Sequence, residues 1–231
     1  MVKINNEKEL NQYIEKYSMD EIFSKDMKPF MELLFFKKNE YMLREGERVN
    51  YLLFLVKGKA KVSITLSNGK SLLLCFYHEF MVLGDLEIIE LNPATSKAQV
   101  IEDTYCIGIA IEKVTSYLLE DAKFLKFICL SLGGKLYQCS KNSSINLLYS
   151  LENRLASYIF TAAERIDEKG QVRIIFDENL TEISELLGTS YRHLLRTLNS
   201  LCTMGVIRKN EQNYEVINEE TLKKLSADLY Q

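Results

Sequence analysis

The sequence predicts an α+β protein: an N-terminal antiparallel β-roll of the jelly-roll type, one long helix, and a C-terminal winged helix-turn-helix. Three observations support this. Short apolar runs separated by turn residues fill residues 38–113, and apolar residues recur at threes and fours after Val114. Two short helices, each followed by glycine, then precede a polar hairpin near the C-terminus. We therefore expect domain boundaries at residues 1–113, 114–149 and 150–231.

The composition is that of an ordinary globular protein with a sizeable core. Of 231 residues, 47% are hydrophobic and 26% charged, and only two are proline. The N-terminus has no apolar stretch of signal-peptide length, and the longest apolar runs are too short to cross a bilayer. Five cysteines without a CxxC pair are typical of a reducing compartment. We expect a cytoplasmic protein.

The spacing of apolar residues in the N-terminal part changes near Lys38. Residues 5–35 carry apolar positions at mixed threes and fours, which predicts helices. In "AKVSITL" apolar and polar residues alternate, as in a half-buried strand. Asn68 and Gly69 tolerate a positive φ and lie between two such runs, so they predict a hairpin.

The long helix carries an apolar seam that a small β-roll could not cover. Its members are Phe124, Leu125, Ile128, Leu132, Leu136 and Cys139. Such seams pack against a second copy in coiled coils, so the sequence predicts a parallel homodimer with Leu132 and Leu136 at its centre. Ser150 is the expected N-cap of the next helix, "SLENRLASYIFTAAERI".

The last segment alternates between strands and short helices. "QVRIIF" predicts a strand, "VIRKNEQNYEVIN" a hairpin and "EETLKKLSADLY" a final helix. Between them, "TEISELLG" is a helix expected to be capped by Thr181 and ended by Gly188. "SYRHLLRTLNSLCTMG" is a second helix, capped by Ser190 and ended by Gly205. Two helices followed by a hairpin are typical of a winged helix-turn-helix.

The second of these helices has two different faces. Leu194, Leu198 and Leu201 share the side expected to be buried. Arg192 and Arg196 share another face at i,i+4 spacing. Arginine can pair with guanine through two hydrogen bonds, and a helix N-terminus favours phosphate, so the pattern predicts DNA binding. A solvated helix face is the alternative, and the net charge of −3 does not by itself indicate nucleic acid.

The order of these parts resembles the Crp/Fnr family of bacterial transcription regulators over nearly the whole chain. "LREGERVNYLLFLVKGKAKVSI" is similar to the family's first strands, and "TEISELLGTSYRHLLRTLNSLCTMGVI" to its DNA-binding helices. "SNGKSLLLCFY" and "LGDLEII" look closest to the YeiL-like branch. The resemblance implies a cyclic-nucleotide-binding-type β-roll and a homodimeric regulator. Its partners would be double-stranded DNA with an inverted-repeat operator, and RNA polymerase.

The resemblance also assigns contacts within the DNA-binding part. It places Tyr191, Arg192 and Arg196 at bases, and makes Thr189 and Ser190 candidates for phosphate. We add three further candidates. His193 is expected to flank the base-contacting residues or to contact phosphate, and Arg208 and Lys209 at the start of the wing are expected at phosphate.

The effector pocket departs from the family pattern. Relatives that bind cyclic nucleotide carry Gly-Glu for the ribose and, about ten residues on, Arg-Ser for the phosphate. This chain keeps the glycine but has a shorter acid, and it lacks the arginine, whose planar fork grips phosphate. We therefore do not expect cyclic nucleotide. The pocket candidates are Gly84, Asp85, Ser96, Lys97, Cys139 and Ser140.

The sequence also bears on other effectors and other classes of function. No cysteine precedes Cys75, so we do not expect the iron–sulfur cluster of the family's oxygen-sensing branch. The two histidines, His78 and His193, accompany no nucleophile or paired-carboxylate motif, so an enzyme is not expected. The alternative is a cyclic-nucleotide-type sensor that acts through protein contacts without specific DNA binding. Acidic residues outnumber lysines and arginines in residues 166–231, which favours that alternative.

Overall fold

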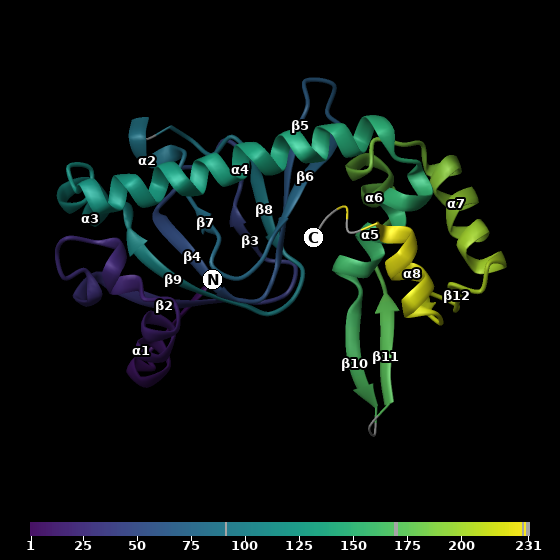
Figure 1. The fold of residues 1–231 in the computed structure, drawn as a ribbon, viewed down its shortest axis with the longest axis horizontal. Coiled ribbons are helices and arrows are strands. Elements are labelled where there is room, and N and C mark those ends of the chain that lie inside the picture. The colour runs from purple at the N-terminus through teal and green to yellow at the C-terminus, as the bar shows by residue number, and fades with distance from the viewer. Residues whose placement is uncertain (91, 169–170, 228, 230–231) are drawn as a thin grey trace. The chain divides into compact units, whose positions relative to one another are not determined.

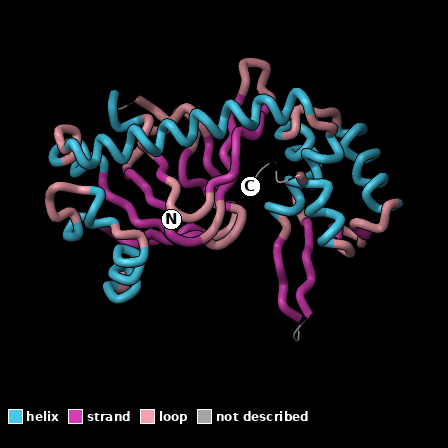
Figure 2. Tube along the Cα trace, in the orientation of Figure 1, coloured by secondary structure: helices cyan, strands magenta, loops and turns pink. Residues whose placement is uncertain are grey.

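The structure is a computed structural model that describes residues 1–90, 92–168, 171–227 and 229. The chain divides into two compact units. The first contains Met1–Ile64 and Phe76–Gln138, and the second contains Thr65–Cys75 and Cys139–Gln231. Figure 1 labels the elements along the chain and Figure 2 colours them by type.

Two antiparallel sheets form the β-roll. Their strand orders are β1-β2-β9-β4-β7 and β3-β8-β5-β6. The strands are β1 Val2–Ile4, β2 Met31–Phe36, β3 Tyr41–Leu43, β4 Tyr51–Lys57, β5 Ala60–Thr65, β6 Ser71–Tyr77, β7 Val82–Leu83, β8 Lys97–Val100 and β9 Thr104–Ala110. The central strand β9 runs antiparallel to both β2 and β4, with Ile107 opposite Leu33 on one side and Phe54 on the other. The predicted β-roll is confirmed.

The hairpin predicted at Asn68-Gly69 is confirmed. It joins β5 to β6, and the N–H of Leu66 donates to the carbonyl of Lys70 at 2.7 Å. Gly69 has a φ of +79°, in the left-handed region that a glycine adopts without strain.

The helical prediction for residues 5–35 is only partly right. It holds for α1 (Glu7–Lys16) and for two 3₁₀ turns, Met19–Ile22 and Lys28–Phe30. Met31–Phe36 is instead strand β2. Leu33 and Leu34 are each only 1% exposed, so both faces of this strand are buried. A short strand buried on both faces shows no alternation, and its sequence resembles a buried helix.

The helix predicted from Val114 is interrupted. After α2 (Glu87–Glu90), the chain forms α3 (Ile111–Tyr117) and then, after four intervening residues, α4 (Ala122–Leu148). Asp121 precedes α4, and its Oδ1 accepts from the N–H of Lys123 at 2.9 Å. Its Oδ2 accepts from the N–H of Ser24 at 2.7 Å. Asp121 therefore caps α4 and binds the N-terminal segment at the same time.

One face of α4 packs on the core of its own chain. Phe124 and Ile128 are 0% and 3% exposed, and Leu132 packs against the same cluster. The ring of Phe124 stacks on Phe23 with centroids 5.9 Å apart. The prediction that Phe124 and Ile128 belong to a seam between two copies is therefore wrong. The physical reason is that the β-roll already removes both side chains from water. Leu132 is half-buried and Leu136 stays 70% exposed, so their place at a dimer centre stays a prediction.

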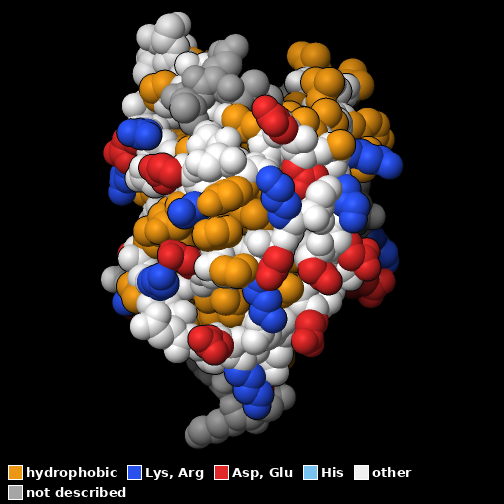
Figure 3. All heavy atoms as spheres, turned by 90° about the vertical axis from the view of Figure 1, so that its left-hand side faces the viewer, with side chains coloured by type: hydrophobic (Ala, Val, Ile, Leu, Met, Phe, Trp, Pro, Cys, Tyr) orange, Lys and Arg blue, Asp and Glu red, His pale blue; other side chains and the backbone are white. Residues whose placement is uncertain are grey.

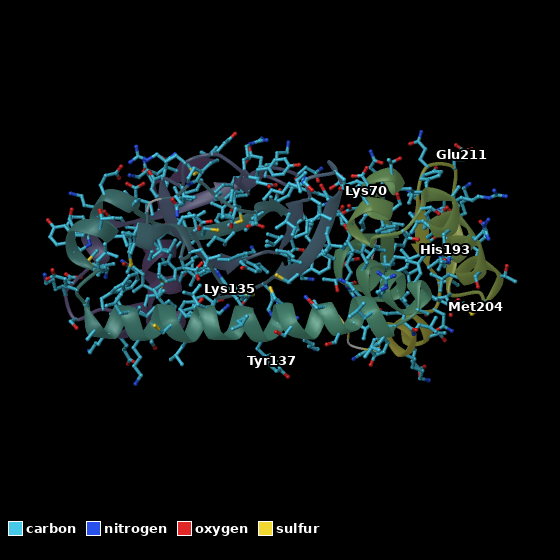
Figure 4. The ribbon with its side chains drawn as sticks, turned by 90° about the horizontal axis from the view of Figure 1, so that it is seen from above. Lys70, Lys135, Tyr137, His193, Met204 and Glu211 are labelled. Carbon is cyan, nitrogen blue, oxygen red and sulfur yellow. The ribbon has the colours of Figure 1, made fainter. Side chains whose placement is uncertain are left out.

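A different face of α4 is exposed. It carries positions at alternating steps of three and four residues: Leu130, Gly133, Tyr137, Ser140, Ser144 and Leu147. Leu130, Tyr137 and Leu147 are 68%, 72% and 84% exposed. Figure 4 shows Tyr137 pointing away from the β-roll, whereas Lys135 extends toward it.

The second unit contains the predicted winged helix-turn-helix. Its elements are α5 Leu151–Ala162, β10 Glu164–Glu168, β11 Gln171–Phe176, α6 Leu180–Leu186, α7 Tyr191–Thr203, β12 Ile207–Lys209, β13 Tyr214–Val216 and α8 Glu219–Ser226. The strands form one sheet in the order β10-β11-β13-β12. Ser150 caps α5 as expected, accepting from the N–H of Asn153 at 3.3 Å. Residues 164–166, expected in the preceding helix, belong instead to β10, which pairs with β11.

The packing of α4 on the β-roll predicts a large effect of Phe124→Ala. Emptying this fully buried site should lower the free energy of unfolding by ~3–5 kcal/mol. Lys123→Ala, at an exposed neighbour on the same turn, should change it by no more than about 0.5 kcal/mol. Urea unfolding followed by circular dichroism measures both, and equal losses for the two variants would contradict the packing.

Candidate DNA-binding interface and effector pocket

The first helix of the helix-turn-helix, α6, begins two residues earlier than its predicted cap implies. Asn179, not Thr181, is the N-cap, and its Oδ1 accepts from the N–H groups of Thr181 at 2.9 Å and Glu182 at 3.3 Å. Thr181 therefore lies in the first turn of the helix, where its N–H donates to the cap. Gly188 ends the helix with a φ of +60°, as expected.

A side chain of α5 supports the turn between the two helices through a hydrogen bond. Arg154 Nη1 donates to the carbonyl of Leu187 at 2.7 Å, at the C-terminus of α6. A guanidinium placed there satisfies a carbonyl that the helix leaves free and complements the helix dipole. The turn that precedes α7 therefore has a fixed support.

The recognition-helix candidate, α7, is divided into a buried and an exposed side as predicted. Ser190 caps it, and its Oγ accepts from the N–H of His193 at 3.2 Å. The buried side consists of Leu194, Thr197, Leu198 and Leu201. It packs the helix into the second unit, so the other side remains available to a partner.

The exposed side of α7 begins with the predicted DNA-contacting residues. Tyr191 is 47% exposed, and Arg192, His193 and Arg196 are exposed as well. Neither arginine forms an ion pair with any residue that the structure describes. Thr189 is half-buried, and its Oγ1 lies 3.3 Å from His193 Nδ1. The two arginines are therefore free to meet an external acceptor.

The wing holds an ion-pair network that the sequence did not predict. The Glu215 carboxylate on β13 accepts from Arg208 Nη2 on β12 at 2.7 Å and from Arg173 Nε on β11 at 2.9 Å. Both arginines together lower the pKa of Glu215 to about 2. Arg208 remains 64% exposed despite this pair, and Lys209 is exposed beside it. The strand register that brings the three together could not be foreseen from sequence spacing.

In the first unit, the predicted effector pocket is nearly filled. Its cavity measures about 20 Å³ and is lined by Gly84, Asp85 and Ser96 among the predicted residues. Gly84 has a φ of +87°, and a Cβ there would lie 2.8 Å from the carbonyl oxygen of Tyr51. Asp85 is 1% exposed and is bound by Lys135 of α4, a residue the sequence analysis missed. The sequence signal that could have indicated Lys135 is a single cationic residue that follows two glycines in an otherwise apolar stretch.

The remaining pocket candidates lie elsewhere. Lys97 opens β8, is half-buried, and does not line the cavity. Cys139 and Ser140 belong to the second unit and stay predictions. Among the described residues, no group of three or more His, Cys, Asp or Glu side chains is arranged to hold a metal ion. No helix in the described part of the chain is long and apolar enough to span a membrane.

The end of the molecule shown in Figure 3 carries charges of both signs. Lysine, arginine and acidic side chains are interspersed there around exposed apolar groups. A mixed field of this kind gives a phosphate backbone no continuous positive surface. This face therefore offers a nucleic acid less than the exposed arginines of α7 and the wing do.

Comparison with known proteins agrees with both parts of the fold. The sequence matches the cyclic nucleotide-binding domain over residues 33–121 and the Crp-like helix-turn-helix domain over residues 153–225. The chain belongs to the Crp/Fnr family. It is therefore a transcription regulator with a DNA-binding helix-turn-helix.

Several members of the family align along most of this Crp/Fnr chain. The regulatory protein YeiL of Escherichia coli O157:H7 is 28% identical over 207 residues, covering 90% of this chain and 91% of that protein. A CRP-like cAMP-activated global transcriptional regulator of Mycobacterium tuberculosis is 22% identical and covers 81% of this chain and 84% of its own. The cAMP in that name is the effector of the mycobacterial protein.

Solved structures of Crp/Fnr regulators share the fold. One from Eubacterium rectale superposes with a TM-score of 0.71 at 13% identity, covering 94% of this chain and 99% of its own. Another, from Thermus thermophilus, gives a TM-score of 0.67 at 16% identity, covering 85% and 98%. At such identities the likeness concerns the fold alone.

The wing network predicts a pH-dependent contribution of Glu215. Its pKa is lowered in the folded protein, so its charge stabilises the fold above its ordinary value of 4.5, and this stabilisation is lost as the pH falls toward about 2. Glu215→Gln should therefore lower the melting temperature at pH 7, and the difference from the native protein should vanish near pH 2. Glu211→Gln, exposed in the turn of the same hairpin, is the control and should match the native protein throughout. A Glu215→Gln difference that stayed constant with pH would contradict this account.

Proposed function

We propose that this Crp/Fnr regulator binds an inverted-repeat operator as a homodimer, with Arg192 and Arg196 contacting bases. The observation that carries the proposal is the entrance of α7. There, two arginines at i,i+4 spacing are exposed on a helix whose other side is buried through its leucines, and neither forms an ion pair with a residue that the structure describes. Arginine offers the two parallel donors that guanine accepts in the major groove.

The neighbouring residues have supporting roles in this proposal. Tyr191 contacts a sugar or a thymine methyl, and Thr189, Ser190 and His193 lie near the phosphates at the helix N-terminus. Lys209 and Arg208 contact the backbone from the wing. Arg208 does so while its guanidinium remains paired with Glu215. RNA polymerase is the protein partner that the proposal assigns to the bound dimer.

The dimer is proposed to form through the exposed face of α4. Leu130, Tyr137 and Leu147 would present large apolar groups to a second copy, and Gly133, Ser140 and Ser144 would let the two helices approach closely. Steps of three and four residues are the spacing of a two-stranded coiled coil. A two-fold axis along such a pair would relate the two copies of α7, as an inverted repeat requires.

The DNA contacts are tested by Arg192→Ala and Arg196→Ala. Each should weaken binding to the selected operator by ~1–3 kcal/mol, with much less loss on random DNA, because a base contact is sequence-specific. Fluorescence anisotropy with both DNAs measures the two losses, after the operator has been obtained by selection from genomic fragments. The matched control is Lys209→Ala, which should weaken binding to both DNAs equally and make the affinity less dependent on salt concentration. If neither arginine variant lost affinity for either DNA, the exposed side of α7 would be a solvated helix face and not a DNA-binding surface.

The dimer interface is tested by Leu130→Asp. Two carboxylates would face each other across the symmetry axis without partners, so the dimer dissociation constant should rise by about 100-fold or more. Leu66→Asp, the same change at a 42% exposed leucine in the β5–β6 hairpin, is the control and should leave dimerisation unchanged. Sedimentation of Leu130→Asp as an unaltered dimer would show that this face of α4 is not the interface.

A further inference from the structure

A buried ion pair occupies the pocket of the β-roll. Lys135 Nζ lies 2.6 Å from Asp85 Oδ1 and 2.7 Å from Oδ2, and the two side chains are only 14% and 2% exposed. Ser131, one turn earlier on α4, donates to Asp85 Oδ2 at 3.2 Å. Two residues of α4 therefore hold one carboxylate of the pocket.

The Lys135 ammonium is fully coordinated. Its third hydrogen-bond acceptor is the carbonyl oxygen of Val82, at 2.7 Å, and it lies 5.1 Å from the centre of the Tyr77 ring. An ammonium has three donors, and here all three have acceptors, with an aromatic face beside them. Figure 4 shows Lys135 extending from α4 toward the strands. These are the features of a site built around a cation.

A second buried acidic side chain lines the pocket and offers an anionic ligand no positive charge. Glu87, which is 5% exposed, also lines the cavity. Its carboxylate accepts from the N–H groups of Glu87 and Thr95, and burial raises its pKa. A phosphate placed here would meet two acidic groups and would have to displace the Lys135 ammonium that neutralises Asp85. With about 20 Å³ left open, a nucleotide also has no room while Lys135 is in place.

We propose that the pocket of the β-roll is a cation site that the chain fills with its own Lys135, so that an internal ion pair fastens α4 to the roll where relatives hold a cyclic nucleotide. The proposal concerns the first unit alone and goes beyond the DNA-binding function. The ligand class that fits the site is an alkylammonium. An anionic nucleotide does not fit it.

The ion pair is tested by comparing one single and one double variant. Lys135→Met keeps the aliphatic stem but leaves a buried carboxylate unpaired, so the melting temperature should fall by about 6 °C or more. Asp85→Asn/Lys135→Met removes both charges and should recover most of that loss. Lys16→Met, which breaks the half-exposed pair with Glu79, is the control and should shift the melting temperature by no more than about 2 °C.

The cation preference is tested by chemical rescue of Lys135→Ala. This change removes the atoms from Cγ to Nζ, and n-propylammonium has the same length and charge. Adding it should raise the melting temperature of the variant, while 1-propanol with sodium chloride at the same concentration should not. The native protein and Lys16→Ala should respond to neither. If the variant does not fold by itself, recovery of folded protein on refolding with propylammonium counts as the rescue.

Four results would overturn the proposal. Lys135→Met could melt at the same temperature as the Lys16→Met control, or the double variant could be as unstable as Lys135→Met alone. Either result would show that the unpaired charge does not cause the destabilisation. Propylammonium could act no better than propanol, which would exclude a cation site. A rise in the melting temperature of the native protein with cyclic AMP would show that the pocket accepts a nucleotide despite Lys135. Each of these outcomes leaves the DNA-binding proposal untouched.

Discussion

The packing of one face of α4 against the core of the β-roll determines what the rest of that helix can do. Burial of Phe124 and Ile128 fixes how the helix is rotated about its axis. That rotation directs Ser131 and Lys135 into the pocket and leaves Tyr137 on the outside. A helix has a repeat of 3.6 residues, so fixing one stripe assigns every other position on it. The ion pair in the pocket and the proposed dimer face therefore both depend on the packing of one apolar stripe of α4 against the β-roll.

The two ion-pair sites show how burial changes the role of a charge. Asp85 and Lys135 are shielded from water, so removal of either partner leaves a costly unpaired group. Glu215 lies on the wing between Arg173 and Arg208, which remain 40% and 64% exposed. There the carboxylate orients two cations that still face solvent. The first arrangement suits a fixed internal contact, and the second suits a surface that meets an anionic partner.

The helix-turn-helix is assembled mainly by local interactions. Asn179 and Ser190 cap its two helices, and Gly188 supplies the left-handed turn between them. Arg154, from the preceding helix, binds the carbonyl of Leu187 and supports the turn from behind. Because most of these contacts span only a few residues, the exposed arginines of α7 are positioned by a short segment of chain.

The sequence by itself determined the features that depend on neighbouring residues. Capping by Ser150 and Ser190, the hairpin at Asn68-Gly69 and the split of α7 into two faces each follow from a period or a cap within a few positions. Only the tertiary structure decided the strand Met31–Phe36, the break before α4 and the partner of its apolar seam. It also brought Lys135 to Asp85 across 50 residues and Arg173 to Glu215 across 42. Such pairs depend on strand register and helix rotation, which the burial of many distant side chains sets together and no local pattern records.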